Sequence, residues 1–155
     1  MAKVIKPPKS IPKSSKHPII FLAGSIDMGR AEPWQLLVET VLANEKVTLL
    51  NPRRDDWDAS WKQSIHHPKF RAQVEWELAG LERADIILVN FVKSTPSPVT
   101  LLELGLFARS KKILVCCPPG YYRRGNVEIV CKQFDIPFFS DLESLLLAVR
   151  ERIRG

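Results

Sequence analysis

Residues 97–108 form an apolar segment in which Glu103 is the one ionisable side chain. The segment opens with Ser and Pro, which favour the start of a helix, and it is apolar on every side, so we expect a buried helix. Burying a carboxylate costs on the order of several kcal/mol unless it is paired or functional. Glu103 therefore has two interpretations: an ion pair with an arginine such as Arg83 or Arg109, or a nucleophile at the mouth of a dry pocket.

A second acidic side chain, Glu77, lies in a segment predicted to be helical over residues 70–83. Val74, Leu78 and Leu81 share one face of that helix, and we expect this face to pack on a sheet. Glu77 directly precedes Leu78, which places it at the edge of the packed face and toward a cleft. Two carboxylates from different elements suit glycosyl chemistry, in which one attacks the anomeric carbon and the other handles the proton of the leaving group. The alternative for Glu77 is an ordinary charged helix surface.

The turn at residues 24–30 has the glycine spacing of a phosphate-binding P-loop, but Arg30 and Ala31 stand where that motif has Lys and Ser or Thr. An NTPase is therefore not predicted, and the lack of a GxGxxG motif also argues against a dinucleotide-binding fold. We expect the backbone N–H groups of the turn, together with Ser25 and Arg30, to approach a phosphate or a ribose. A plain strand-to-helix turn is the alternative.

The elements that must position these residues follow an alternating pattern. Short apolar runs predict strands, and amphipathic or apolar stretches between them predict helices of ten residues or so. Strands joined through helices imply a parallel sheet covered on both faces, and therefore a doubly wound α/β fold with five strands. Ligands of such sheets bind at the carboxyl ends of the strands. The strands are expected at residues 19–23, 47–50, 85–91, 112–117 and 136–139, and the helices at 33–44, 70–83, 98–110, 126–133 and 141–153.

Length and charge limit the classes of function. The chain has 155 residues, 45% of them hydrophobic, which suits one domain over residues 18–155. Its formal charge is +6, but five lysines lie in residues 1–17, a proline-rich segment that we expect to be a flexible basic tail. The nearly neutral remainder argues against a groove for a nucleic-acid polymer. No segment has the length and apolar character of a membrane helix or a signal peptide, so we expect a soluble, cytoplasmic protein.

The cysteines and histidines do not predict a metal site. Cys116, Cys117 and Cys131 form no CxxC pattern, and we expect them to be buried reduced thiols. His66 and His67 are adjacent, so their side chains point in different directions, and no third ligand has suitable spacing. We therefore expect neither a metal nor an organic cofactor.

Four segments in a fixed order resemble the nucleoside 2-deoxyribosyltransferase superfamily. That family includes deoxyribosyltransferases and 2'-deoxynucleoside 5'-monophosphate N-glycosidases, and the resemblance extends from Pro18 to Phe139. It implies the same α/β fold and chemistry at an N-glycosidic bond. The segments are residues 21–26, the spacing from Glu77 to Asp85 ahead of the apolar run 86–89, residues 97–108 with Glu-Leu-Gly at their centre, and residues 112–115.

The resemblance assigns roles to the two carboxyl groups. The family's catalytic glutamate, which attacks C1' of the sugar and forms a covalent glycosyl-enzyme, corresponds to Glu103. Its acidic partner, usually an aspartate that contacts the nucleobase and transfers a proton, corresponds to Glu77. A tyrosine that family members place in the first strand near the nucleophile is Phe21 here.

Further positions of the family bind the rest of the substrate. Ser97 corresponds to the position that holds the 5'-phosphate in the nucleotide hydrolases. Gly24, Ser25 and Ile26, with the turn that continues to Arg30, are similar to the phosphate and sugar loop. Asn126 corresponds to an asparagine that, in the transferases, reaches the sugar 5'-hydroxyl from a neighbouring subunit, which implies a homo-oligomer with a shared active site.

The loop at residues 51–57 carries groups suited to a nucleobase. Asp55 or Asp56 can accept hydrogen bonds, and Trp57 offers a stacking face. The alternative is that Trp57 and Trp61 pack the loop down while its arginines pair with the aspartates.

The sequence therefore predicts an enzyme that cleaves or transfers the N-glycosidic bond of a nucleoside or nucleotide through a covalent intermediate on Glu103. The alternative, from a different class, is a non-catalytic nucleotide-binding or regulatory module of the same fold.

Overall fold

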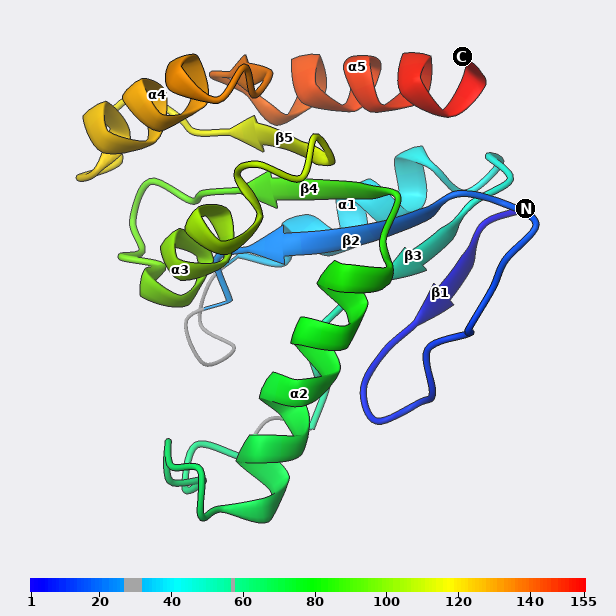
Figure 1. The fold of residues 1–155 in the computed structure, drawn as a ribbon, viewed down its shortest axis with the longest axis vertical. Coiled ribbons are helices and arrows are strands. Elements are labelled where there is room, and N and C mark those ends of the chain that lie inside the picture. Colours follow the sequence, from blue (N-terminus) through cyan, green and yellow to red (C-terminus); the bar gives the residue numbers. More distant parts are fainter. Residues whose placement is uncertain (27–31, 57) are drawn as a thin grey trace.

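The computed structural model describes residues 1–26, 32–56 and 58–155 (Figure 1). Over these residues, six parallel strands form one sheet in the order β1-β3-β2-β4-β5-β6, and five helices cover it. The predicted α/β fold with a parallel sheet is confirmed, with one strand more than expected. The strands are β1 (Lys3–Ile5), β2 (Ile19–Gly24), β3 (Thr48–Leu50), β4 (Ile86–Asn90), β5 (Ile113–Cys116) and β6 (Phe138–Phe139), and the helices are α1 (Trp34–Val41), α2 (Pro68–Arg83), α3 (Pro98–Phe107), α4 (Arg124–Gln133) and α5 (Leu142–Arg154).

The helices lie in two layers, one on each face of the sheet. Side chains of the central strand β2 alternate between these faces, as the pleat of a strand requires. Phe21 and Ala23 belong to the core beneath α2, α3 and α4, whereas Ile20 and Leu22 belong to the core beneath α1 and α5. Figure 1 shows α1 behind the sheet and α3 in front of it. Both faces of β2 are therefore apolar, which explains its continuous hydrophobic run.

The sixth strand comes from the segment expected to be a flexible tail. Residues 3–5 pair in parallel with β3 as an edge strand, with Lys3 opposite Thr48. Ile5 is only 4% exposed and joins the core on the α2 side of the sheet. The expectation of a tail without structure is therefore wrong for β1. Backbone hydrogen bonds to β3 and the burial of one side chain offset the conformational entropy that is lost when these residues become ordered.

The residues after β1 lie against α2. The indole Nε1 of Trp76 donates a hydrogen bond of 2.8 Å to the carbonyl of Lys9, and Arg83 donates to the carbonyl of Pro12. Ile11 packs against the core beneath α2. The basic segment is thus attached to the domain through its backbone carbonyls and one apolar side chain.

Helix α2 packs on the sheet through a different face from the one predicted. Gln73, Gly80 and Leu81 are buried, whereas Val74 and Leu78 are exposed to about 40%. A Cβ atom at Gly80 would lie 2.7 Å from the ring of Phe21, so the helix approaches β2 closely at this glycine. This contact fixes the rotation of α2 and turns the side of the helix that carries Gln73 and Glu77 inward.

Helix α3 is buried on one side only, although its apolar sequence predicts burial all round. Its inner side carries Thr100, Glu103 and Leu104. Its outer leucines and valine are more than half exposed in the single chain: Val99, Leu102 and Leu106. In the described part of the chain, no helix combines the length and apolar character needed to cross a bilayer.

Candidate active site

A pocket of about 290 Å³ lies between the carboxyl ends of the strands and helices α2 and α3. Without β1, the strand order is that of a doubly wound sheet. The chain adds β3 on one side of β2 and then crosses over to add β4 on the other side, so the order of the strands reverses between β2 and β4. The pocket opens at this switch point, as expected for ligands of such sheets. It brings together five residues predicted from the sequence: Gly24, Ile26, Glu77, Ser97 and Glu103.

Glu103 lies on the inner side of α3 and is 7% exposed. The arginines considered as ion-pair partners have other contacts: Arg83 binds the carbonyl of Pro12, and Arg109 stacks 4.8 Å from the ring centroid of Phe134. Among the described residues, no cation pairs with Glu103. The ion-pair interpretation is therefore wrong, and the carboxyl group faces the pocket unpaired.

Glu77 lies on the inward side of α2 and is half-buried. Its Oε2 accepts a hydrogen bond of 2.8 Å from the amide Nε2 of Gln73, one helical turn earlier. The interpretation of Glu77 as part of an ordinary charged helix surface is therefore wrong.

Burial changes the acidity of both carboxyl groups in the pocket. It raises the pKa of Glu77 to about 7, although the hydrogen bond from Gln73 acts in the opposite direction. It raises the pKa of Glu103 to about 8, and the neighbouring charge of Glu77 adds to this increase. A pKa in this range suits a group that takes part in acid–base chemistry near neutral pH.

Hydroxyl groups connect the ends of β2 and β4 at one side of the pocket. Ser25 is buried; its Oγ accepts a hydrogen bond of 2.9 Å from the backbone N–H of Val92 and contacts Oγ of Ser97. Oγ of Ser97 also lies 2.9 Å from Oγ1 of Thr95. The indole of Trp34 donates to the carbonyl of Ser25 at 3.0 Å, which fixes the backbone after β2.

Ser97 occupies the N-cap position of α3, as predicted, but its hydroxyl makes no capping hydrogen bond. Its backbone is left-handed, with φ 50° and ψ 52°, which is uncommon for a residue with a side chain. The hydroxyl instead contacts Ser25 and Thr95. Residues held in sparsely populated backbone conformations are enriched at functional sites.

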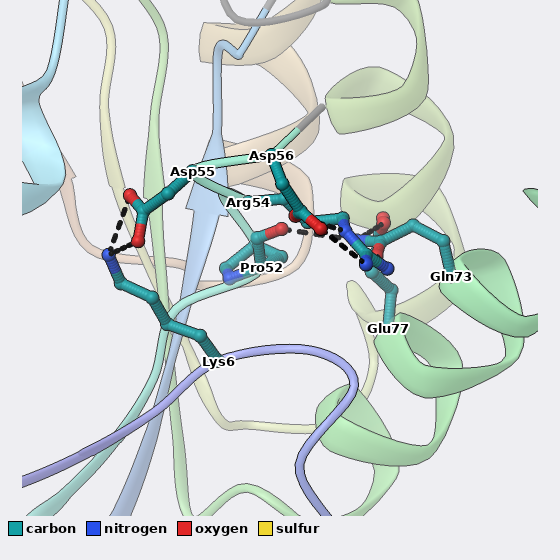
Figure 2. A network of polar contacts seen from close by, with 7 residues as sticks. All are labelled: Lys6, Pro52, Arg54, Asp55, Asp56, Gln73 and Glu77. Atoms are coloured by element: carbon teal, nitrogen blue, oxygen red, sulfur yellow. Dashed lines mark hydrogen bonds and ion pairs between the residues drawn. The ribbon is translucent and has the colours of Figure 1, made fainter. Parts of the chain in front are cut away.

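The loop after β3 joins the pocket through an arginine. Arg54 pairs with Asp56 at 3.0 Å, and its guanidinium lies 5.0 Å from the ring centroid of Trp61. Its Nη1 donates to Oε1 of Gln73 at 3.4 Å. Figure 2 shows these contacts, which continue to Glu77, and beside them the separate ion pair of Lys6 and Asp55 at the surface. The pairing of arginines with aspartates, one of the two interpretations of this loop, is therefore confirmed for Arg54.

Other residues predicted for the site lie elsewhere or are not described. Phe21 is fully buried in the core and does not line the pocket. Asp56 does not line the pocket and is largely exposed, and Asn126 is exposed on α4. Arg30 and Trp57 lie outside the described residues.

Sequence reasoning missed several residues that line the pocket. Gln73 and Arg54 add polar groups to it, and Phe70 and Thr100 also line it. The spacing of four residues from Gln73 to Glu77 was the available signal, because residues i and i+4 are neighbours on a helix. Within residues 1–26, 32–56 and 58–155, no group of three His, Cys, Asp or Glu side chains is arranged to hold a metal ion.

Comparisons with known proteins agree with this architecture. The sequence profile of a family described as nucleoside 2-deoxyribosyltransferase like matches residues 17–121. A crystal structure of a conserved protein from Enterococcus faecalis is similar in fold, with a TM-score of 0.61 and 11% sequence identity, over 88% of this chain and 99% of that chain. No curated protein is a significant sequence match to the chain.

Proposed function

Because the chain belongs to the nucleoside 2-deoxyribosyltransferase-like family, we propose that it cleaves or transfers the N-glycosidic bond of a nucleoside or nucleotide. The observation that carries this proposal is the pair of carboxyl groups in one pocket, Glu77 and Glu103, with no cation paired to either among the described residues. Burial of two carboxyl groups disfavours their charged forms and therefore costs free energy. A catalytic role explains why the chain keeps both groups in the pocket.

In the proposed mechanism, a carboxylate oxygen of Glu103 attacks C1' of the sugar. An ester bond to C1' forms while the bond between C1' and the base nitrogen breaks, and Glu77 gives its proton to the departing base. Water, or a second base, then attacks C1' and releases Glu103, while Glu77 takes the proton of the attacking group. Two displacements at one carbon predict retention of configuration.

The hydroxyl groups of Ser25 and Ser97 support a position for the 5' end of the substrate. They lie beside the N-terminus of α3, where the helix dipole and free N–H groups favour an anion. This side of the pocket suits a 5'-hydroxyl or a 5'-phosphate, and the opposite side, between Phe70 and Val74, suits a flat base.

We propose that a second copy of the chain covers the outer sides of α2 and α3. These helices flank the pocket. Leu78, Leu102 and Leu106 are exposed outside it, next to Val74 and Val99, which line the pocket and are also partly exposed. The outer side of α3 carries no charged residue, and charge depletion is typical of the core of an interface. In such an oligomer Asn126, which does not line the pocket of its own chain, would belong to a shared site.

The experiment that tests the function is incubation of the protein with a panel of deoxynucleosides, deoxynucleotides and ribonucleotides, each with and without an added acceptor base. Chromatography that shows free base alone identifies a hydrolase, and a new nucleoside identifies a transferase. Glu103→Ala is the control and should abolish turnover while ligand binding survives. If no substrate reacts but ligands bind equally to both proteins, the non-catalytic nucleotide-binding module is the better description.

The covalent step has its own measurement. Rapid acid quench during turnover, followed by mass spectrometry, should find a peptide that contains Glu103 with the mass of one sugar added. A reaction that inverts the configuration at C1', with no labelled peptide, would exclude the covalent mechanism while leaving the cleavage itself in place.

A further inference from the structure

Gln73 on α2 is 4% exposed, and both polar atoms of its side chain have partners. Its Nε2 donates to the carbonyl of Pro52 at 3.1 Å and to Oε2 of Glu77 at 2.8 Å. Its Oε1 accepts from Nη1 of Arg54 at 3.4 Å. The amide thus joins the loop after β3 to the carboxyl group proposed to transfer the proton (Figure 2).

These partners permit one orientation of the amide. A carbonyl and a carboxylate only accept hydrogen bonds, whereas a guanidinium only donates them. Turning the amide over would set its oxygen against Pro52 and Glu77, and its NH2 group against Arg54. The N–H donor of Gln73 is therefore directed at Glu77 by the arrangement of the site.

On the basis of the proposed function, we propose that Gln73 is a positioning residue for proton transfer: it holds Oε2 of Glu77 as an acceptor and leaves Oε1 to carry the transferable proton. In a protonated carboxyl group the carbonyl oxygen is the better acceptor, and the other oxygen bears the hydrogen. A donor at Oε2 therefore selects the form with hydrogen on Oε1. Without Gln73, the proton is free to occupy either oxygen of Glu77.

The same hydrogen bond sets the pH at which Glu77 changes from acid to base. A donor stabilises the charged form of a carboxyl group and so lowers its pKa, against the effect of burial. Two charged groups face Glu77 from other elements: Glu103 on α3, and Arg54 from the loop after β3, which Asp56 neutralises. Glu77 must release a proton in one half of the reaction and recover it in the other, so a pKa near the working pH is required.

The first experiment measures protonation without turnover. The carboxyl carbon of Glu77 is titrated by 13C NMR in the wild type and in Gln73→Met, with Glu77→Gln used to assign the signal. We expect the midpoint to rise by about one pH unit or more in Gln73→Met, because the ionised form loses its donor. Gln63→Met, which alters another glutamine at the same pocket, is the matched control and should leave the midpoint unchanged. An unchanged midpoint in a folded Gln73→Met protein overturns the proposal.

A second measurement keeps the test valid if Gln73→Met does not fold. In the wild type, the side-chain NH2 signals of Gln73 should shift with the midpoint of Glu77, since the hydrogen bond strengthens as the carboxyl group ionises. Signals that stay constant while Glu77 titrates overturn the proposal.

The kinetic test separates positioning from a merely structural role. In Gln73→Met we expect kcat to fall roughly ten-fold or more with little change in KM, and the maximum of the kcat/KM profile to move to higher pH. A structural role alone would leave that maximum in place. Should the substrate panel show no turnover at all, the proposed function fails, whereas the two NMR titrations still decide whether Gln73 controls Glu77.

Discussion

Glu77 and Glu103 share a pocket in which burial raises the pKa of both groups, to about 7 and about 8. Because their charges interact, the two protons leave in two steps that belong to the pair. The active form carries its one proton on Glu77 and its negative charge on Glu103. Because Glu103 has the higher pKa, this form is the less populated of the two singly protonated arrangements, but both arrangements are most abundant between these two values. We expect kcat/KM to follow a bell-shaped curve with its maximum between about pH 7 and 8. An alkaline limb that persists in Glu77→Gln would contradict the assignment of Glu77 as the acid.

Stability should also depend on this pair. Both groups have a folded-state pKa above the usual value of 4.5, so their contribution to stability is complete below about pH 4.5 and is lost as pH rises through about 7 and 8. In Glu103→Gln the free energy of unfolding should fall less steeply with pH, and it should exceed that of the wild type at pH 9 by on the order of a few kcal/mol. Urea unfolding between pH 5 and 9 measures this, with exposed Glu151→Gln as the control.

At this scale the sequence indicated the two carboxyl groups of the pocket but not the residues that contact them. Glu103 stands out because it is the one carboxylate in an apolar helical segment, which can be recognised without knowledge of tertiary contacts. Gln73 does not stand out, since glutamine is common on helix surfaces and its burial depends on how α2 is rotated. That rotation follows from the contact of Gly80 with Phe21, which involves residues far apart in the sequence.

At the scale of elements, β1 offers a matched pair of substitutions. Ile5 is buried in the core, whereas its neighbour Val4 is exposed to 37% on the other face of the strand. We expect Ile5→Ala to reduce the free energy of unfolding by about 2 kcal/mol or more, and Val4→Ala to change it by less than about 0.5 kcal/mol. Equal and negligible effects of both substitutions in thermal or urea unfolding would mean that residues 3–5 do not pair with the sheet in solution.

The central strands were predictable because each is a run of apolar residues buried on both faces. β1 was not, since a strand of three residues between lysines and prolines has no periodic signal, and its pairing depends on β3. The start of α5 was predicted correctly: Asp141 caps it, and its carboxylate accepts a hydrogen bond of 2.7 Å from the N–H of Ser144.

At the scale of the whole molecule, the apolar outer sides of α2 and α3 predict association. Leu102→Glu places a charge at the centre of the exposed side of α3, where the leucine is 62% exposed, and should yield a monomer in light scattering. Leu147→Glu is the matched control, because this leucine of α5 is similarly exposed at 59% but lies away from the pocket. A wild-type protein that is monomeric at all concentrations would exclude the shared site.

The order of the strands could not be derived from the sequence, because alternating strands and helices fit several parallel sheets. The observed order places β2 and β4 side by side, with Ala23 opposite Val89. That adjacency brings Ser25 from one loop to Ser97 from the other, which composition and periodicity do not reveal.

The position of β1 has a consequence for how the chain folds. In the described sheet its neighbour is β3, and Lys3 pairs with Thr48, so the strand cannot form until the chain well beyond it has been synthesised. Parallel pairing between distant segments is slow, because a long loop must close first. In refolding followed by pulsed hydrogen exchange, the amide of Lys3, which bonds to the carbonyl of Val47, should therefore gain protection after those of β2 and β4. The earliest strand in the sequence would be among the last to enter the sheet.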